Sequence, residues 1–151
     1  MNKFSTNNLF ISVLGIGYIP FASGTFGSIG GLIIGYIINI TYYDLFYILI
    51  PIFFLFGVIG SNKYENETGE KDSSIIVIDE VVGQLIAMMF FINDNFLIFL
   101  SFLIFRLFDI FKPWPASYID KNLKGGIGVM LDDVVAGGYT IITIYLIKLA
   151  I

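Results

Sequence analysis

Histidine and cysteine are both absent from this chain of 151 residues. Without cysteine there can be no disulfide, no thiolate metal site and no cysteine nucleophile. Without histidine there can be no phosphohistidine intermediate, no histidine-based acid–base pair and no histidine-bound zinc. Any chemistry must therefore use carboxylates, lysine, arginine, hydroxyl groups or a hard metal ion.

Charged residues are also scarce. They make up 13% of the chain, whereas 57% is hydrophobic and the mean hydropathy is +0.88. A soluble domain has about 25% charged and roughly 45–50% apolar residues, so the excess has no place in a soluble core of this size. No basic run typical of nucleic-acid binding is present, and nucleic acid is not expected as a partner. We therefore expect residues 1–151 to form one membrane-embedded domain.

The apolar runs predict an all-α, polytopic membrane bundle of about five short transmembrane helices. The expected spans are residues 29–40 with their flanks, 45–60, 75–92, 96–111 and 134–151. Residues 9–19 are apolar but too few to cross a bilayer, so they predict an N-terminal interfacial or re-entrant helix. A hydroxyl-rich glycine turn is expected at 23–28, and loops are expected at 61–74 and 113–128.

The lysine residues indicate an orientation for this bundle. The short turns after the first and third spans contain no lysine or arginine, whereas the N-terminus and the two long loops contain lysines. The lysines concerned are Lys3, Lys63, Lys71, Lys112, Lys121 and Lys124. Because basic loops usually remain in the cytoplasm, these segments are predicted to be cytoplasmic, and only Lys148 disagrees.

Polar residues from distant parts of the chain fall at this same end of the predicted spans. They are Thr25, Asp79, Glu80, Arg106, Asp109, Lys112, Asp132 and Asp133. Charged side chains in lipid-embedded helices are costly and usually mark a functional site. We therefore expect these side chains to gather at one depth, close to the cytoplasmic surface.

Five residues of this group are carboxylates. Asp79–Glu80 and Asp132–Asp133 could act as helix caps, because negative charge is favoured at a helix N-terminus. Together with Asp109, however, they would repel one another strongly unless cations neutralise them. Mg²⁺ suits oxygen ligands and often links carboxylates to a phosphate, whereas zinc and copper favour the missing histidine and cysteine. We predict Mg²⁺ ligation by Asp79, Glu80, Asp132 and Asp133, with catalytic roles for Asp79, Glu80, Asp109 and Asp133.

The basic residues allow two interpretations. Arg106 and Asp109 are three residues apart and can pair on one helix face, while Arg106 or Lys112 can extend to anionic headgroups. Near a metal-binding carboxylate cluster, the same groups can instead hold a phosphate monoester. We predict that Arg106, Lys112, Lys124 and the Thr25 hydroxyl bind such a substrate. One carboxylate of the cluster would accept a proton from the attacking water.

Four segments strengthen this interpretation. They read SGTFGS, IVIDEVVGQLIAM, FRLFDIFKPWPASYID and GGIGVMLDDVVAG. In this order and spacing they closely resemble bacterial phosphatidylglycerophosphatase A, over about residues 15–138. The resemblance implies a Mg²⁺-dependent, multi-pass enzyme of the bacterial inner membrane that removes the terminal phosphate from phosphatidylglycerophosphate, giving phosphatidylglycerol, in phospholipid biosynthesis. One departure is Ser23, where the family commonly has proline before the glycine.

Two other classes compete with this one. A CDP-alcohol phosphotransferase would also use carboxylates and magnesium in a membrane, but its D-G-x-x-A-R segment is absent. A carboxylate-based transporter would distribute its charges through the membrane depth, whereas here they fall at one end of the spans. The residues are compatible with direct attack by water or with a covalent phospho-enzyme, and with one metal ion or two. They do not define the oligomeric state.

Overall fold

The computed structural model describes residues 5–150, and those residues form helices and connecting turns without a strand. In chain order the elements are α1 (Thr6–Ile11), the 3₁₀ helix η1 (Ile16–Tyr18), α2 (Ser23–Thr41), α3 (Tyr43–Thr68), α4 (Ile78–Met88), α5 (Asn95–Phe111), α6 (Ala116–Asn122) and α7 (Gly126–Ala150). The predicted all-α membrane bundle is confirmed. Lys3 and the expected end of the last span at residue 151 lie outside the described residues.

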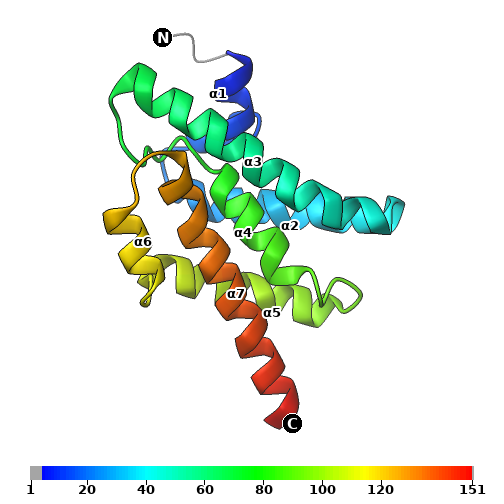
Figure 1. Cartoon of the computed structure of the whole chain (residues 1–151). Coiled ribbons are helices and arrows are strands. Elements are labelled where there is room, and N and C mark those ends of the chain that lie inside the picture. Colours follow the sequence, from blue (N-terminus) through cyan, green and yellow to red (C-terminus); the bar gives the residue numbers. More distant parts are fainter. Residues whose placement is uncertain (1–4, 151) are drawn as a thin grey trace.

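The short helix α4 is the centre of the bundle. It packs against α2, α3, α5 and α7 (Figure 1). Nine of its 11 residues are buried, and Val81, Val82 and Leu85 belong to the main hydrophobic core. At 1.5 Å per residue the helix is about 16 Å long, roughly half the hydrocarbon thickness of a bilayer. The expected span at 75–92 is therefore a shorter helix enclosed by protein.

Three helices in the described part of the chain are long and apolar enough to cross a membrane, namely α2, α3 and α7. Helix α5 is nearly as long, with 17 residues. In the apolar windows of α2 and α3 only 22% of the residues are buried inside the molecule. Ile33 and Ile37 on α2 and Phe56 and Ile59 on α3 are exposed. Because such extensive apolar faces are unfavourable in water, the exposed sides of α2 and α3 are expected to contact lipid.

Both predicted long loops are partly helical. Helix α3 continues to Thr68, because its polar final turns still have a buried face that includes Ser61 and Tyr64. Helix α7 begins at Gly126 rather than at residue 134. There the Gly126 N–H donates a hydrogen bond of 2.7 Å to the Asn62 side chain of α3. The polar end of α3 thus supports the start of α7, a contact that the sequence pattern does not reveal.

The N-terminal segment at 9–19 is also not one continuous helix. α1 ends at Ile11, and the chain turns through Val13 and Leu14, which both have positive φ, before η1 begins. The Ile11 carbonyl accepts a hydrogen bond of 2.9 Å from the Val77 N–H, which fixes this segment beside the start of α4. The expected glycine turn at 23–28 is instead the beginning of α2.

The closest approach of α4 and α7 depends on two glycines. A Cβ at Gly137 would lie 2.8 Å from the Gly83 carbonyl oxygen, and a Cβ at Gly83 would lie 2.9 Å from the Asp133 carbonyl oxygen. In contrast, a Cβ at the neighbouring Gly138 would meet nothing within 4 Å. The two adjacent glycines of α7 therefore have different constraints.

We expect Gly137→Ala to destabilise the protein by about 1–3 kcal/mol, because the added methyl group overpacks the contact between α4 and α7. Gly138→Ala, the matched control, should be neutral or slightly stabilising, because alanine favours a helix. Thermal unfolding in detergent, followed by circular dichroism, measures both variants. Equal unfolding temperatures would contradict the close approach.

Candidate active site

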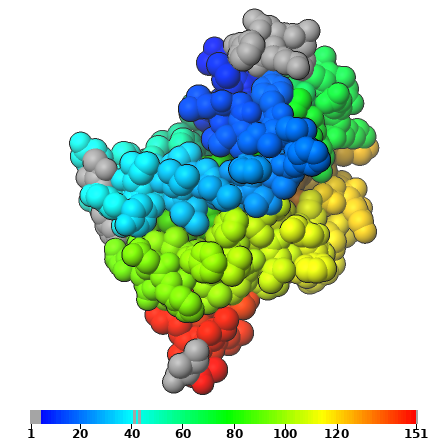
Figure 2. Space-filling model, turned by 180° about the vertical axis from the view of Figure 1, so that it is seen from behind, coloured from blue at the N-terminus to red at the C-terminus, as the bar shows by residue number. Residues whose placement is uncertain are grey.

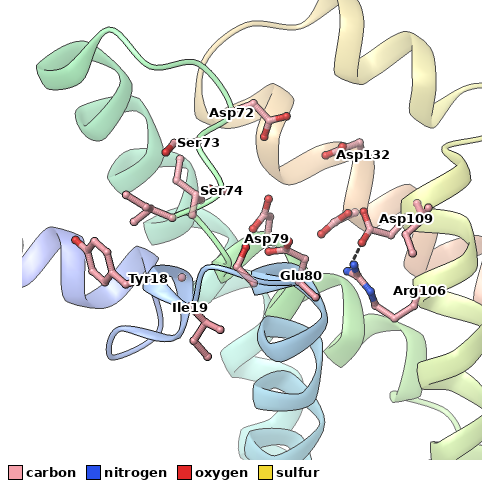
Figure 3. A pocket seen from close by; sticks show the side chains of 18 of the residues that line it. Tyr18, Ile19, Asp72, Ser73, Ser74, Asp79, Glu80, Arg106, Asp109 and Asp132 are labelled. Atoms are coloured by element: carbon pink, nitrogen blue, oxygen red, sulfur yellow. Dashed lines mark hydrogen bonds and ion pairs between the residues drawn. The ribbon is translucent and has the colours of Figure 1, made fainter.

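A cavity of about 720 Å³ opens at the N-terminal end of α4. Its walls come from η1 and the start of α2, the loop that precedes α4, the end of α5 and the second turn of α7. Figure 3 shows carboxylates from several of these elements around one space. The charged residues that line it are Asp72, Asp79, Glu80, Arg106, Asp109, Lys112, Asp132 and Asp133. The predicted gathering of distant charges is therefore present in the structure.

Three carboxylates of the cavity lie close together. Asp79 and Glu80 belong to the first turn of α4, where the helix dipole favours negative charge, and Asp133 comes from α7. One carboxylate oxygen from each residue lies within 4.8 Å of the others. Asp79 Oδ1, Glu80 Oε2 and Asp133 Oδ2 are buried without a hydrogen-bond partner. We call these residues the acid trio. Its oxygen-only donors fit a hard divalent cation such as Mg²⁺.

Asp132 was predicted as a metal ligand, but it lies outside the trio and is bound by Lys112. Lys112 follows the last residue of α5 with a left-handed backbone, φ 41°. Its Nζ donates hydrogen bonds of 2.6 Å to Asp132 on α7 and to Asp120 on α6. Burial lowers the pKa of Lys112, but the hydrogen bonds and charges of Asp120 and Asp132 outweigh this effect, so the pKa is raised above its ordinary value. The other oxygen of Asp132, Oδ1, is buried without a partner.

Arg106 lines the cavity from α5, about one and a half turns before Lys112. It pairs with Asp109 one turn further along α5, as one of the two interpretations expected, and both side chains still line the cavity (Figure 3). Arg106 Nη1 also donates to the Ser28 hydroxyl at 3.3 Å, and Ser28 in turn donates to the Gly24 carbonyl. A Cβ at Gly24 would overlap with the Glu80 carboxylate. A larger residue at position 24 would therefore require the Glu80 carboxylate to shift.

Two predicted substrate-binding residues do not line the cavity. Thr25 is half-buried in the first turn of α2, and Lys124 is exposed beside a separate cavity of about 130 Å³. Sequence reasoning also missed three residues at or behind the cavity wall: Ser28, Asp72 and Asp120. Ser28 and Asp120 belong to segments that carried the family resemblance, which was the available signal. Asp72 lies in the polar connection before α4, where nothing distinguished it from its neighbours.

The fold and the cavity define a polytopic membrane protein with an oxygen-rich charged site at one end of its bundle. A family model described as phosphatidylglycerophosphatase A matches residues 9–148. The chain belongs to the phosphatidylglycerophosphatase A family. The expected enzyme class, a phosphatase that hydrolyses a phosphate monoester, is confirmed by this membership.

Individual relatives agree with the family assignment. Phosphatidylglycerophosphatase A of Escherichia coli (strain K12) is 33% identical, over 82% of this chain and 72% of the relative. Phosphatidylglycerophosphatase A of Haemophilus influenzae is 37% identical, over 89% of this chain and 83% of the relative. A Bacteroides thetaiotaomicron protein, provisionally named a phosphatidylinositol-3-phosphatase, is 37% identical over 86% of each chain. No solved structure matches this chain.

Replacing Asp120 should change the titration of Lys112. Asp120→Asn removes one of the two anionic partners that raise the Lys112 pKa, so the pKa should fall. At a fixed, mildly alkaline pH a larger fraction of Lys112 would be neutral and would react faster with an acylating reagent, as measured by mass spectrometry. Asp94→Asn, at the other end of α5, is the control. An unchanged rate in Asp120→Asn would show that Asp132 alone sets the pKa.

Proposed function

We propose that this protein hydrolyses the terminal phosphate of phosphatidylglycerophosphate in a Mg²⁺-dependent reaction at the cytoplasmic face of the bacterial inner membrane. The observation that carries the proposal is the acid trio, whose buried oxygens lack partners and lie beside two basic side chains. Buried carboxylates this close are strongly unfavourable unless a cation neutralises them. The names of two relatives support the choice of substrate.

Asp79, Glu80 and Asp133 would hold the Mg²⁺ ion. When bound, the ion supplies positive charge to the phosphoryl group and to the attacking water. A carboxylate of the cavity accepts the proton that the water releases. Asp132 would have a different role, because it accepts a hydrogen bond from Lys112 and lies beside the trio rather than in it.

Two basic residues are available to orient the phosphate. The Lys112 ammonium has three N–H donors, of which Asp120 and Asp132 engage two, so one donor remains for a phosphate oxygen. Arg106 has five N–H donors, and its Nε is buried without a partner. Both cations lie in the cavity wall, where charge-assisted hydrogen bonds to a phosphate are strong.

The cytoplasmic orientation is supported by the lysines. Lys71, Lys121 and Lys124 come together around the smaller cavity, which shares Asp72 with the main one. Three of the lysines that the charge pattern assigned to the cytoplasm therefore lie at the same end of the molecule as the acid trio. The grouping of charge at one end also favours an enzyme over a transporter, whose carboxylates would follow a path through the bilayer.

Neutralising any member of the acid trio should abolish most of the activity. We expect Asp79→Asn, Glu80→Gln and Asp133→Asn each to lower Mg²⁺-dependent phosphate release from phosphatidylglycerophosphate by about 100-fold or more. Asp44→Asn, which removes an exposed carboxylate outside the cavity, is the control and should retain activity. Near-normal turnover in all three trio variants would contradict the proposed site.

Phosphatidylinositol 3-phosphate, assayed in parallel, tests the headgroup suggested by the Bacteroides relative's name.

Binding of the cation should also be visible without catalysis. A ligand that binds only the folded state stabilises it, so Mg²⁺ should raise the thermal unfolding temperature of the detergent-solubilised protein, and a chelator should reverse the shift. The shift should be absent in Asp133→Asn and preserved in Asp44→Asn. An identical shift in both variants would place the ion elsewhere.

A further inference from the structure

Part of the apolar lining of the cavity is exposed at the surface of the molecule. Pro20 and Ala22, just before α2, line the cavity together with Ile110 near the end of α5. All three are exposed, and Ile110 is 65% exposed, so they border both the cavity and the outside of the molecule. The loop before α4 provides the polar residues Asp72 and Ser73, and its apolar lining residues Ile75 and Ile76 are half-buried and buried rather than exposed.

The two apolar edges belong to helices that lie against each other. Figure 2 shows α2 and α5 side by side on one face of the molecule. Arg106 of α5 is hydrogen-bonded to Ser28 of α2, and Ile110 lies one turn beyond Arg106 on the same face of α5. Because Ala22 immediately precedes α2, it stands at the corresponding end of that helix. We call Pro20 and Ala22 the α2 lip and Ile110 the α5 lip.

Apolar surface continues outward from both lips. Phe21 is 79% exposed beside the α2 lip, and Phe111 is 77% exposed beside the α5 lip. An apolar path therefore leads from the charged cavity to the lipid-facing exterior. A lipid headgroup and its acyl chains need this combination, since moving acyl chains from lipid into water is unfavourable in proportion to their length.

Resting on the proposed lipid phosphatase function, we propose that the acyl chains of the substrate pass between the α2 lip and the α5 lip. The headgroup phosphate then reaches the acid trio while the chains remain in the bilayer. Ile110 and Phe21 are on this view determinants of specificity for long-chain lipids, and they take no part in the chemistry at phosphorus.

The test compares a long-chain with a short-chain substrate. Ile110→Asn and Phe21→Asn are assayed on dioleoyl phosphatidylglycerophosphate in mixed micelles and on its water-soluble dibutanoyl analogue. We expect kcat/KM for the dioleoyl lipid to fall about fivefold or more, because apolar contacts to the chains are lost, with little change for the analogue. Leu103→Asn, on an exposed α5 position outside the cavity, is the matched control and should alter neither.

Equal losses on both substrates, or no loss on either, would overturn the path between the lips. Ile110→Ala removes apolar surface at an exposed position without adding a polar group, so it tests the α5 lip even if the asparagine variant does not fold. Absence of phosphate release from either substrate by the unaltered protein would count against the proposed function instead.

Discussion

Mutual repulsion within the acid trio is the constraint on which the rest of the structure depends. The carboxylates of Asp79 and Asp133 are held close because α4 and α7 touch one turn further along, where Gly83 follows Asp79 by four residues and Gly137 follows Asp133 by four. The glycines bring the two helix backbones together one turn away from the carboxylates. The energy of this arrangement must come from the packing of the bundle, because the charges themselves oppose it.

The two basic residues of the cavity form ion pairs with carboxylates outside the acid trio. Arg106 is matched by Asp109, and Lys112 is shared by Asp120 and Asp132. Two cations thus face these three carboxylates, before Asp72 and the acid trio are counted. An anionic phosphate would not enter such a site unless further positive charge were present. The excess of acid over base is therefore a physical reason to expect a bound cation, and it is independent of the family to which the chain belongs.

Much of this architecture could be predicted from the sequence. The features that could not be predicted depend on what surrounds a segment in the folded protein. The composition indicates a membrane protein, and the positions of the charged residues along the apolar runs indicate a single charged site. Both predictions follow from the cost of placing charge in hydrocarbon. An apolar run such as the one around α4 has the same sequence pattern whether lipid or protein surrounds it. The sequence therefore did not predict that α4 is an 11-residue helix buried inside the bundle. The contact of Asn62 with Gly126 could not be predicted either, because the two residues are 64 positions apart, and the contact of Asp120 with Lys112 depends on how α6 folds back after α5.

The start of α2 links the chemistry of the site to the membrane. Gly24 lies against Glu80 of the trio, Ser28 orients Arg106, and Ala22 forms one lip of the apolar path. These residues lie within about two turns of helix, so a shift of this segment would affect the proposed metal ligand Glu80, the proposed phosphate-binding residue Arg106 and the proposed lipid path together. The segment carries Ser23 at the position where the family resemblance implies proline. In the structure α2 nevertheless begins at that serine, after a left-handed Ala22, so the helix start does not depend on the proline ring.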